Sequence, residues 1–264
     1  MKLYKGSKFL VTVRPTMTYG NVIAATTGDE MVYAWTAFRF PKYPFAAKLT
    51  SVAVMIQGAD VTRVEEPLDL YFAQPNPDGT APPNLGPAHA AIDMADGGCY
   101  RNILGHVSIL ADDFDDHIPY NAFAQIGQSR GAVADVDAPG IILGSEALTS
   151  NDEAAFTHLY VCAQSSGTVE FGTNVDLNQA GHQGATTTPT TITVDTDPRK
   201  AFSIGDTIHA ADGAEVGVLT GFGDAAGANK ATKLTFADGI VEALQHQDEL
   251  INLQPITLRL GFEA

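Results

Sequence analysis

The last apolar alternation of the chain, Ile256–Phe262, most constrains the fold, because the strand that it predicts has no obvious partner nearby in the sequence. An earlier segment contains two extended runs, Leu159–Ala163 and Thr168–Gly172, on either side of Ser165-Ser166-Gly167. Short runs joined by a Gly-containing turn predict a β-hairpin. A further strand should close this unit soon after Leu177. The chain instead makes a long excursion before Ile256, so we expect a second module inserted before the final strand.

The remaining segments are also short and strand-like. Outside the excursion, the runs that predict strands are Phe9–Val13, Met31–Phe40, Lys48–Ile56, Leu68–Ala73 and Ile103–Leu110. Turns rich in Pro and Gly separate them, and no long segment has the period of a helix. The aromatic run Met31–Phe40 favours core packing over a ligand-stacking platform. This pattern predicts an all-β fold, with an antiparallel sandwich or jelly roll formed by residues 1–182 and 255–264.

The excursion, residues 183–254, has its own strand and turn signals. Its five candidate strands are Thr191–Val194, Thr207–Ala210, Glu215–Leu219, Lys233–Phe236 and Glu249–Ile251. Five strands over this length predict a small SH3-like or OB-like barrel. The glycine-rich run Gly221–Gly227 precedes a strand pattern and not a helix, so we interpret it as a hairpin loop and not as a phosphate-binding loop.

Composition narrows the class of protein. Of 264 residues, 45% are hydrophobic and 17% charged, which is typical of a soluble globular protein. No run approaches the roughly 20 apolar residues of a membrane span, so no membrane partner is expected. The N-terminal apolar run is broken by Lys8, Thr12 and Arg14, and we predict no export signal. Two distant cysteines, Cys99 and Cys162, fit neither a disulfide framework nor a structural zinc site, as expected for synthesis in a reducing cytoplasm.

Charge is distributed unevenly along the chain. The formal net charge is −16, yet the first 28 residues contain no acidic residue. The basic residues of this N-terminal arm are Lys2, Lys5, Lys8 and Arg14. An acidic body repels phosphate backbones, so we expect no nucleic-acid partner. Two interpretations of the arm remain open, an electrostatic tether to an acidic surface and a solvated terminus.

Few residues suggest chemistry. The best metal candidate is the acidic cluster Asp112, Asp113, Asp115 and Asp116, next to His117. Calcium sites need several oxygen ligands and usually a Gly that turns the loop. No Gly lies inside the cluster, so a solvated turn with Asp capping local amides is the favoured interpretation and the metal site is a weak prediction. The histidines form no metal motif and no GxSxG sequence occurs, so we expect neither an enzyme nor a cofactor.

Five segments in order carry a family resemblance. They are Val11–Thr16, Ala47–Val54, Leu68–Pro77, Leu104–Phe114, and the pair Leu159–Val161 with Leu258–Phe262. In sequence, order and spacing, these segments resemble a family of small structural proteins of tailed bacteriophages, often encoded near the major capsid protein. Members of that family run almost directly from the hairpin to the final strand, whereas this chain inserts residues 183–254 there.

The resemblance implies a virion component without enzymatic activity. The expected function is that of a capsid decoration, or cement, protein that binds the major capsid protein on the capsid exterior, as a homotrimer, after synthesis in the host cytoplasm. The arm residues Lys2, Lys5, Lys8 and Arg14 would contact the capsid, and deletion of residues 1–14 would abolish binding without unfolding the domain.

A second class of function remains open, a tail or head-fibre component or adhesin with a glycan-binding module. Its glycan contacts would lie on the insert or near Trp35. The insert offers only three aromatic residues besides histidine, Phe202, Phe222 and Phe236, and no Trp or Tyr. The insert therefore offers few aromatic side chains on which a glycan could stack.

Overall fold

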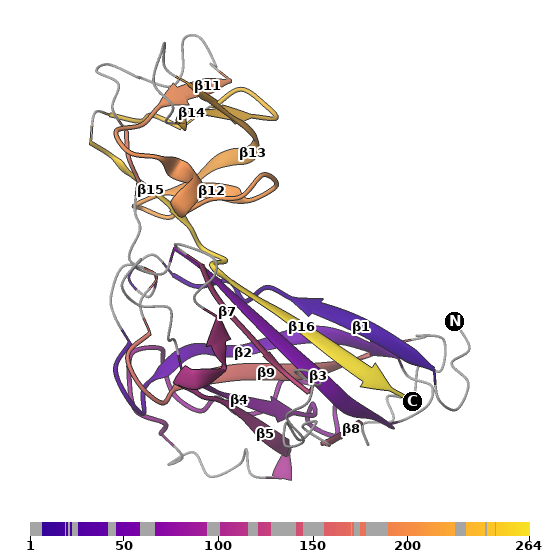
Figure 1. The fold of residues 1–264 in the computed structure, drawn as a ribbon. Helices are drawn as coiled ribbons and strands as arrows, with labels where there is room; N and C mark the ends of the chain where they lie inside the picture. Colours follow the sequence, from indigo (N-terminus) through magenta and orange to yellow (C-terminus); the bar gives the residue numbers. More distant parts are fainter. Residues whose placement is uncertain are drawn as a thin grey trace.

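The protein is all-β, with two antiparallel sheets packed as a sandwich and a third sheet beyond one end of them (Figure 1). The computed structural model describes residues 7–18, 20, 22, 26–41, 46–58, 67–93, 101–115, 121–127, 141–144, 156–169, 171, 175–177, 190–224, 231–240, 242–245 and 247–264. Everything below refers to these residues. None of the helices among them is long and apolar enough to cross a membrane.

The first sheet is built around the last strand of the chain. Its order is β1-β16-β3-β7-β6, and β8 pairs with one end of β3. The strands are β1 (Lys8–Val13), β16 (Ile256–Glu263), β3 (Ala46–Gln57), β7 (Asn121–Ile126), β6 (Phe114–Asp115) and β8 (Ile142–Gly144). The predicted final strand is therefore confirmed, and it lies between β1 on one side and β3 on the other. A short 3₁₀ helix, η2 (Ala111–Asp113), precedes β6.

The second sheet has the order β2-β9-β4-β5. Its strands are β2 (Met31–Pro41), β9 (Phe156–Ser165), β4 (Leu68–Ala73) and β5 (Ile103–Ile109). The predicted hairpin within 159–172 is wrong, because β9 pairs with β2 and β4, and Val169 pairs instead with Thr26. Both edges of β9 are occupied, so the segment after Ser165 has no place beside it.

Aromatic side chains join the two sheets. Phe9 of β1 stacks on Phe262 of β16 with ring centroids 5.1 Å apart. Phe40 of β2, in the opposite sheet, meets Phe262 edge to face at 5.3 Å. Offset-stacked and edge-to-face contacts are the favoured geometries of aromatic pairs. Phe262 is 1% exposed and thus lies at the centre of the contact between the two layers.

The third sheet has its own hydrophobic core and the order β10-β15-β12-β13-β14-β11. Its strands are β10 (Val175–Asp176), β15 (Glu249–Asn252), β12 (Thr207–Ala210), β13 (Glu215–Asp224), β14 (Ala231–Phe236) and β11 (Thr191–Thr193), and a 3₁₀ helix, η3 (Pro198–Lys200), also belongs to this part. All five strands predicted here are confirmed. Gly221 and Gly223, predicted to lie in a loop, instead belong to β13 and pair with β14.

The third sheet begins earlier than residue 183. Val175 and Leu177 are fully buried in its core. Leu177 forms a bridge with Val194, and the Asp195 N–H donates to the Asp176 carbonyl at 3.0 Å. These contacts bring the two edge strands, β10 and β11, together, so the sheet curls strongly on itself. We call residues 175–254 the insert below; its likeness to SH3 or OB barrels remains a prediction.

We predict that Phe262→Ala lowers the free energy of unfolding by about 3–5 kcal/mol, because it removes a buried ring from the contact between the sheets. Leu10→Ala, in the neighbouring strand, should change it by no more than about 0.5 kcal/mol, because the Leu10 side chain is 62% exposed. Urea unfolding followed by circular dichroism measures both values. Equal losses in the two variants would contradict this account of the core.

Candidate functional site

The outer face of the first sheet carries an exposed edge strand. In β1, Phe9, Val11 and Val13 point toward the core, whereas Lys8, Leu10 and Thr12 are exposed. Gly261 of β16 pairs with Leu10 on one side and with Ser51 on the other. A hollow of 460 Å³ lies on this face and is lined by eight residues, among them Lys8, Leu10 and Ser51. The Ser51 hydroxyl lies where a side chain at Gly261 would begin.

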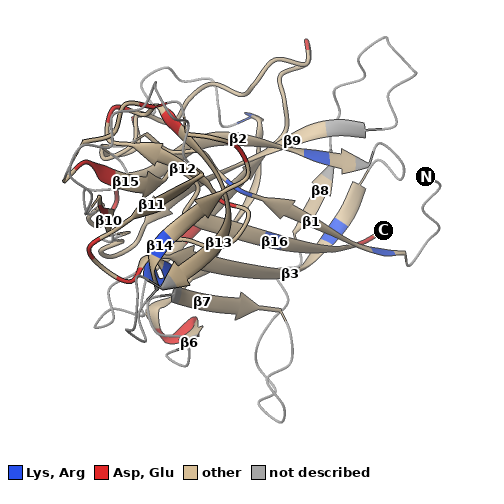
Figure 2. Cartoon of the chain, turned by 90° about the horizontal axis from the view of Figure 1, so that it is seen from above, with Lys and Arg blue, Asp and Glu red and all other residues tan. Residues whose placement is uncertain are grey.

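Basic side chains predominate on the same face. Lys8 of β1, Lys48 of β3 and Arg259 of β16 are exposed, and Glu263 is the one acidic residue on these three strands. The chain as a whole carries a formal charge of −16. Figure 2 shows the basic segments of β1 and its neighbours near the two chain termini, and acidic segments around β10 and β15. The molecule therefore has a locally basic sheet face and an acidic insert.

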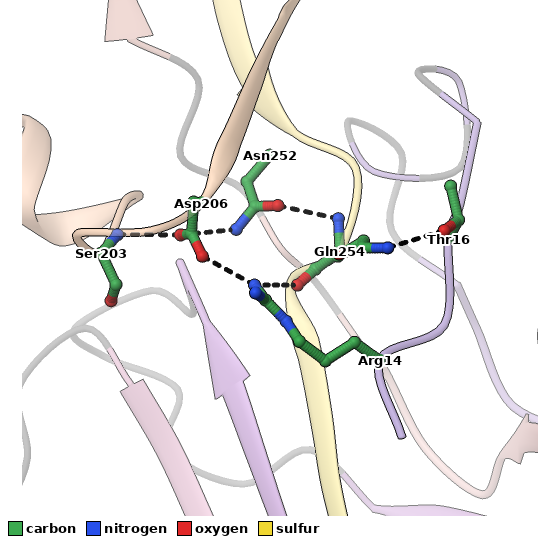
Figure 3. Close-up of polar contacts among 6 residues, drawn as sticks. All are labelled: Arg14, Thr16, Ser203, Asp206, Asn252 and Gln254. Atoms are coloured by element: carbon green, nitrogen blue, oxygen red, sulfur yellow. Dashed lines mark hydrogen bonds and ion pairs between the residues drawn. The ribbon is translucent and has the colours of Figure 1, made fainter. Parts of the chain in front are cut away.

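The second notable site is the joint between the sandwich and the insert. Arg14 follows β1 directly, and its guanidinium donates to Asp206 Oδ1 at 2.7 Å and to the Gln254 carbonyl at 3.2 Å (Figure 3). The Arg14 side chain is 33% exposed and that of Asp206 only 4%. Buried charges are generally retained only when they are paired and hydrogen-bonded. Arg14 thus neutralises a carboxylate at the base of the insert.

Further hydrogen bonds complete the joint. The other oxygen of Asp206 accepts from the Ser203 N–H at 2.8 Å and from Asn252 Nδ2 at 2.9 Å. Gln254 Nε2 donates to Thr16 Oγ1 at 2.8 Å, as Figure 3 also shows. The Met17 N–H donates to the Leu253 carbonyl at 2.8 Å. The joint therefore links the segment after β1 to the turn at Asp206 and to the C-terminal end of the insert, and so holds the insert on the sandwich.

The structure separates the four predicted capsid-contact residues. Lys8 is exposed at the start of β1. Arg14 forms an ion pair with Asp206 of the same chain. This structural role of Arg14 was not predicted from the sequence. Lys2 and Lys5 lie outside the described residues. Asp206, Asn252 and Gln254 were missed because Gly205-Asp206 looks like an ordinary turn and lies 192 residues from Arg14.

The predicted acidic metal site is only partly described. Asp113 Oδ2 accepts from the Leu110 N–H at 2.9 Å and so caps η2, while Asp112 is exposed. Asp116 and the side chain of Asp115 lie outside the described residues. Among the residues with described positions, no group of three or more His, Cys, Asp or Glu side chains could hold a metal ion. The local contacts fit a capped turn.

The insert also brings acidic groups together where its edge strands meet. Burial raises the pKa of the Asp176 carboxyl above its ordinary value, and the nearby charges of Asp195 and Glu249 raise it further. At the start of η3, the Arg199 side chain donates to Asp197, and this hydrogen bond lowers the pKa of Asp197. Three carboxylates, those of Asp176, Asp195 and Glu249, thus lie close together at one side of the insert.

Comparison with known proteins gives no family for the chain. No family model matches the sequence, and no curated protein matches it either. The fold is that of an all-β protein with antiparallel sheets. The features that bear on its function are the basic face of the first sheet and the acidic insert.

We predict that Arg14→Met lowers the free energy of unfolding by about 1–3 kcal/mol, because Asp206 then stays buried without its counter-charge. In a double-mutant cycle with Asp206→Asn, measured by urea unfolding, the two effects should be strongly non-additive. Arg199→Met is the matched control. Its ion pair with Asp197 is more exposed, at 54% and 21% for the two side chains, and its loss should cost less than about 1 kcal/mol. Additive effects of Arg14→Met and Asp206→Asn would contradict the joint.

We predict that Asp176→Asn stabilises the protein at neutral pH and low salt. The folded-state pKa of Asp176 is raised, so the folded protein binds the proton more readily than the unfolded chain. The penalty is therefore fully present above the folded-state pKa and disappears as the pH falls below the ordinary value of 3.8. Thermal unfolding at several pH values should show the gain of the variant shrinking toward low pH and high salt. A gain that is constant with pH would refute this origin.

Proposed function

We propose that the protein is a non-enzymatic virion protein of a tailed bacteriophage, a capsid decoration protein that binds and stabilises the shell of the major capsid protein. The five sequence segments that resemble this family are the first support. Four of them lie largely on described strands of the sandwich, in β1, β3, β4 and β5, and the fifth joins β9 with β16. The resemblance thus follows the sandwich and leaves out the insert.

The observation that carries the proposal is the uneven distribution of charge between the first sheet and the insert. The exposed basic residues Lys8, Lys48 and Arg259 lie on the outer face of the first sheet, whereas acidic residues outnumber basic ones in the insert. Figure 1 places the start of β1 and the C-terminal end of β16 at the side of the sandwich that is remote from the insert. Complementary charge steers association and favours one orientation. A shell with acidic patches would then bind the sheet face, and the insert would project outward.

Repetition strengthens such binding. A shell offers many equivalent sites, so a modest interface on each subunit gains strength when several subunits are linked. We propose a homotrimer for this reason, as the family resemblance implies. The oligomeric state is measured by light scattering on the purified full-length chain, and a monomer would count against the trimer.

The alternative, an adhesin with a glycan-binding insert, finds less support. Phe202 and Phe236 are buried in the core of the insert, and Phe222 packs against that core. Trp35 is half-buried, and its indole N–H donates to the Pro83 carbonyl at 2.8 Å. In the described part of the insert and around Trp35, these rings are committed to packing.

We predict that purified virions carrying this protein contain hundreds of copies, at a ratio near one per capsid subunit or one trimer per local threefold position. Because a cement protein occupies equivalent shell sites, its number must scale with that of the shell subunits. Quantitative mass spectrometry against the major capsid protein measures the ratio. A handful of copies would instead favour a tail or fibre component, and absence from virions would overturn the proposal.

A test of the basic arm needs a shorter deletion than residues 1–14. Deletion of residues 1–14 would remove β1, including the buried Val13 and the ring of Phe9, and also Arg14 of the joint. The earlier expectation that this deletion spares the fold is therefore wrong. Deletion of residues 1–6 removes Lys2 and Lys5 and leaves β1 intact. It should weaken shell binding, more at low than at high salt, without changing the melting temperature.

A further inference from the structure

We infer that the outer edge of β1 is a docking strand, to which an extended, acidic and apolar segment of the shell protein adds as a neighbouring β-strand. This inference rests on the proposed function and names the contact through which it would operate. In such strand addition, main-chain hydrogen bonds supply affinity, and alternate side chains supply specificity.

On the side away from β16, no strand of the described part of the chain pairs with β1. β1 lies at the end of its sheet, and its one described partner is β16. The Ala264 N–H donates to the Ser7 carbonyl at 2.9 Å, so Ser7 turns its backbone groups toward β16. Backbone groups alternate in direction along an antiparallel strand. Those of Lys8, Leu10 and Thr12 therefore point outward, where no described residue pairs with them.

The edge is unusual in its side chains. Natural proteins commonly protect an exposed strand edge with charges, Pro, bulges or a covering segment. In β1 the three residues with outward backbone groups are also those with exposed side chains, and the middle one is Leu10, which is 62% exposed. Beside Leu10, the hollow that Lys8, Leu10 and Ser51 help to line leaves room for a side chain of the added strand.

The charges around the edge select the partner. Lys8 flanks Leu10, and Lys48 and Arg259 lie on the same outer face. Glu263, the one acidic residue on β1, β3 and β16, lies between Lys8 and Lys48 in the register, so these three strands keep a net positive charge on this face. A strand that places an apolar residue beside Leu10 and an acidic residue beside Lys8, two positions along, complements this face.

Thr12→Pro tests the docking strand directly. The Thr12 N–H points outward, so Pro removes a donor that the partner needs and no ladder bond to β16. Thr12→Val is the matched control, because it keeps the N–H. Binding is measured by cosedimentation of the labelled full-length protein with shells of the major capsid protein that lack it. We expect Thr12→Pro to bind at least about tenfold more weakly, and Thr12→Val to bind like the wild type.

A second variant covers the case in which Thr12→Pro does not fold. Leu10→Glu changes an exposed side chain and should keep the wild-type melting temperature, yet it places an acidic group against the acidic partner. It should also weaken binding at least about tenfold. Wild-type binding by folded Leu10→Glu, or by folded Thr12→Pro, would overturn the docking strand.

The outcomes separate the two proposals. Binding of the wild type together with undiminished binding of either folded variant overturns the docking strand and leaves the decoration function intact. Failure of the wild type to bind any shell overturns the decoration function itself. If Thr12→Pro instead dissociates an oligomer of the wild type in light scattering, the occupant of the edge is a second copy, and our assignment of the partner is wrong.

Discussion

The sandwich depends on the placement of its final strand between two strands from the beginning of the chain. β16 pairs with β1 along Lys8–Val13 and with β3 along Lys48–Ile56. Without β16, β1 would have no partner in its sheet, and the stack of Phe9 on Phe262 would be lost. Contacts between residues so distant in sequence carry a large loop-closure cost and form slowly. The first sheet can therefore be completed only after the whole insert has been synthesised.

This connectivity makes the joint necessary. The chain enters the insert at Val175, which is buried in the core of the insert together with Leu177. It leaves the insert through Leu253 and Gln254, and Pro255 then leads directly into β16. Two covalent connections alone would allow the insert to swing about them. Arg14 contributes a third attachment from a different part of the chain, and it does so at a buried carboxylate, where loss of the partner is most costly. A fixed insert keeps its acidic surface away from the basic face of the sheet.

Local patterns predicted the strands well where apolar and polar residues alternate, as in Ile256–Phe262 and throughout the insert. β7 was missed because its inward positions are the small residues Ala122 and Ala124, while the apolar Phe123 faces outward. β10 is only two residues long, too short for any period to be visible. The joint could not be predicted, because the pairing of Arg14 with Asp206 arises from the packing of two units and has no local sequence signal. The basic character of the N-terminal region was visible in the sequence, but only the register placed Lys48 and Arg259 on the same face as Lys8.

The direct passage from β15 into β16 also has a mechanical consequence. A pull on the insert along the axis of β16 would load its ladders with β1 and β3 in shear, since both neighbours run antiparallel to it along most of its length. In shear, many hydrogen bonds must break together, whereas a peeling load breaks them one after another. A force on the insert is thus carried along the direction in which the first sheet resists separation most strongly.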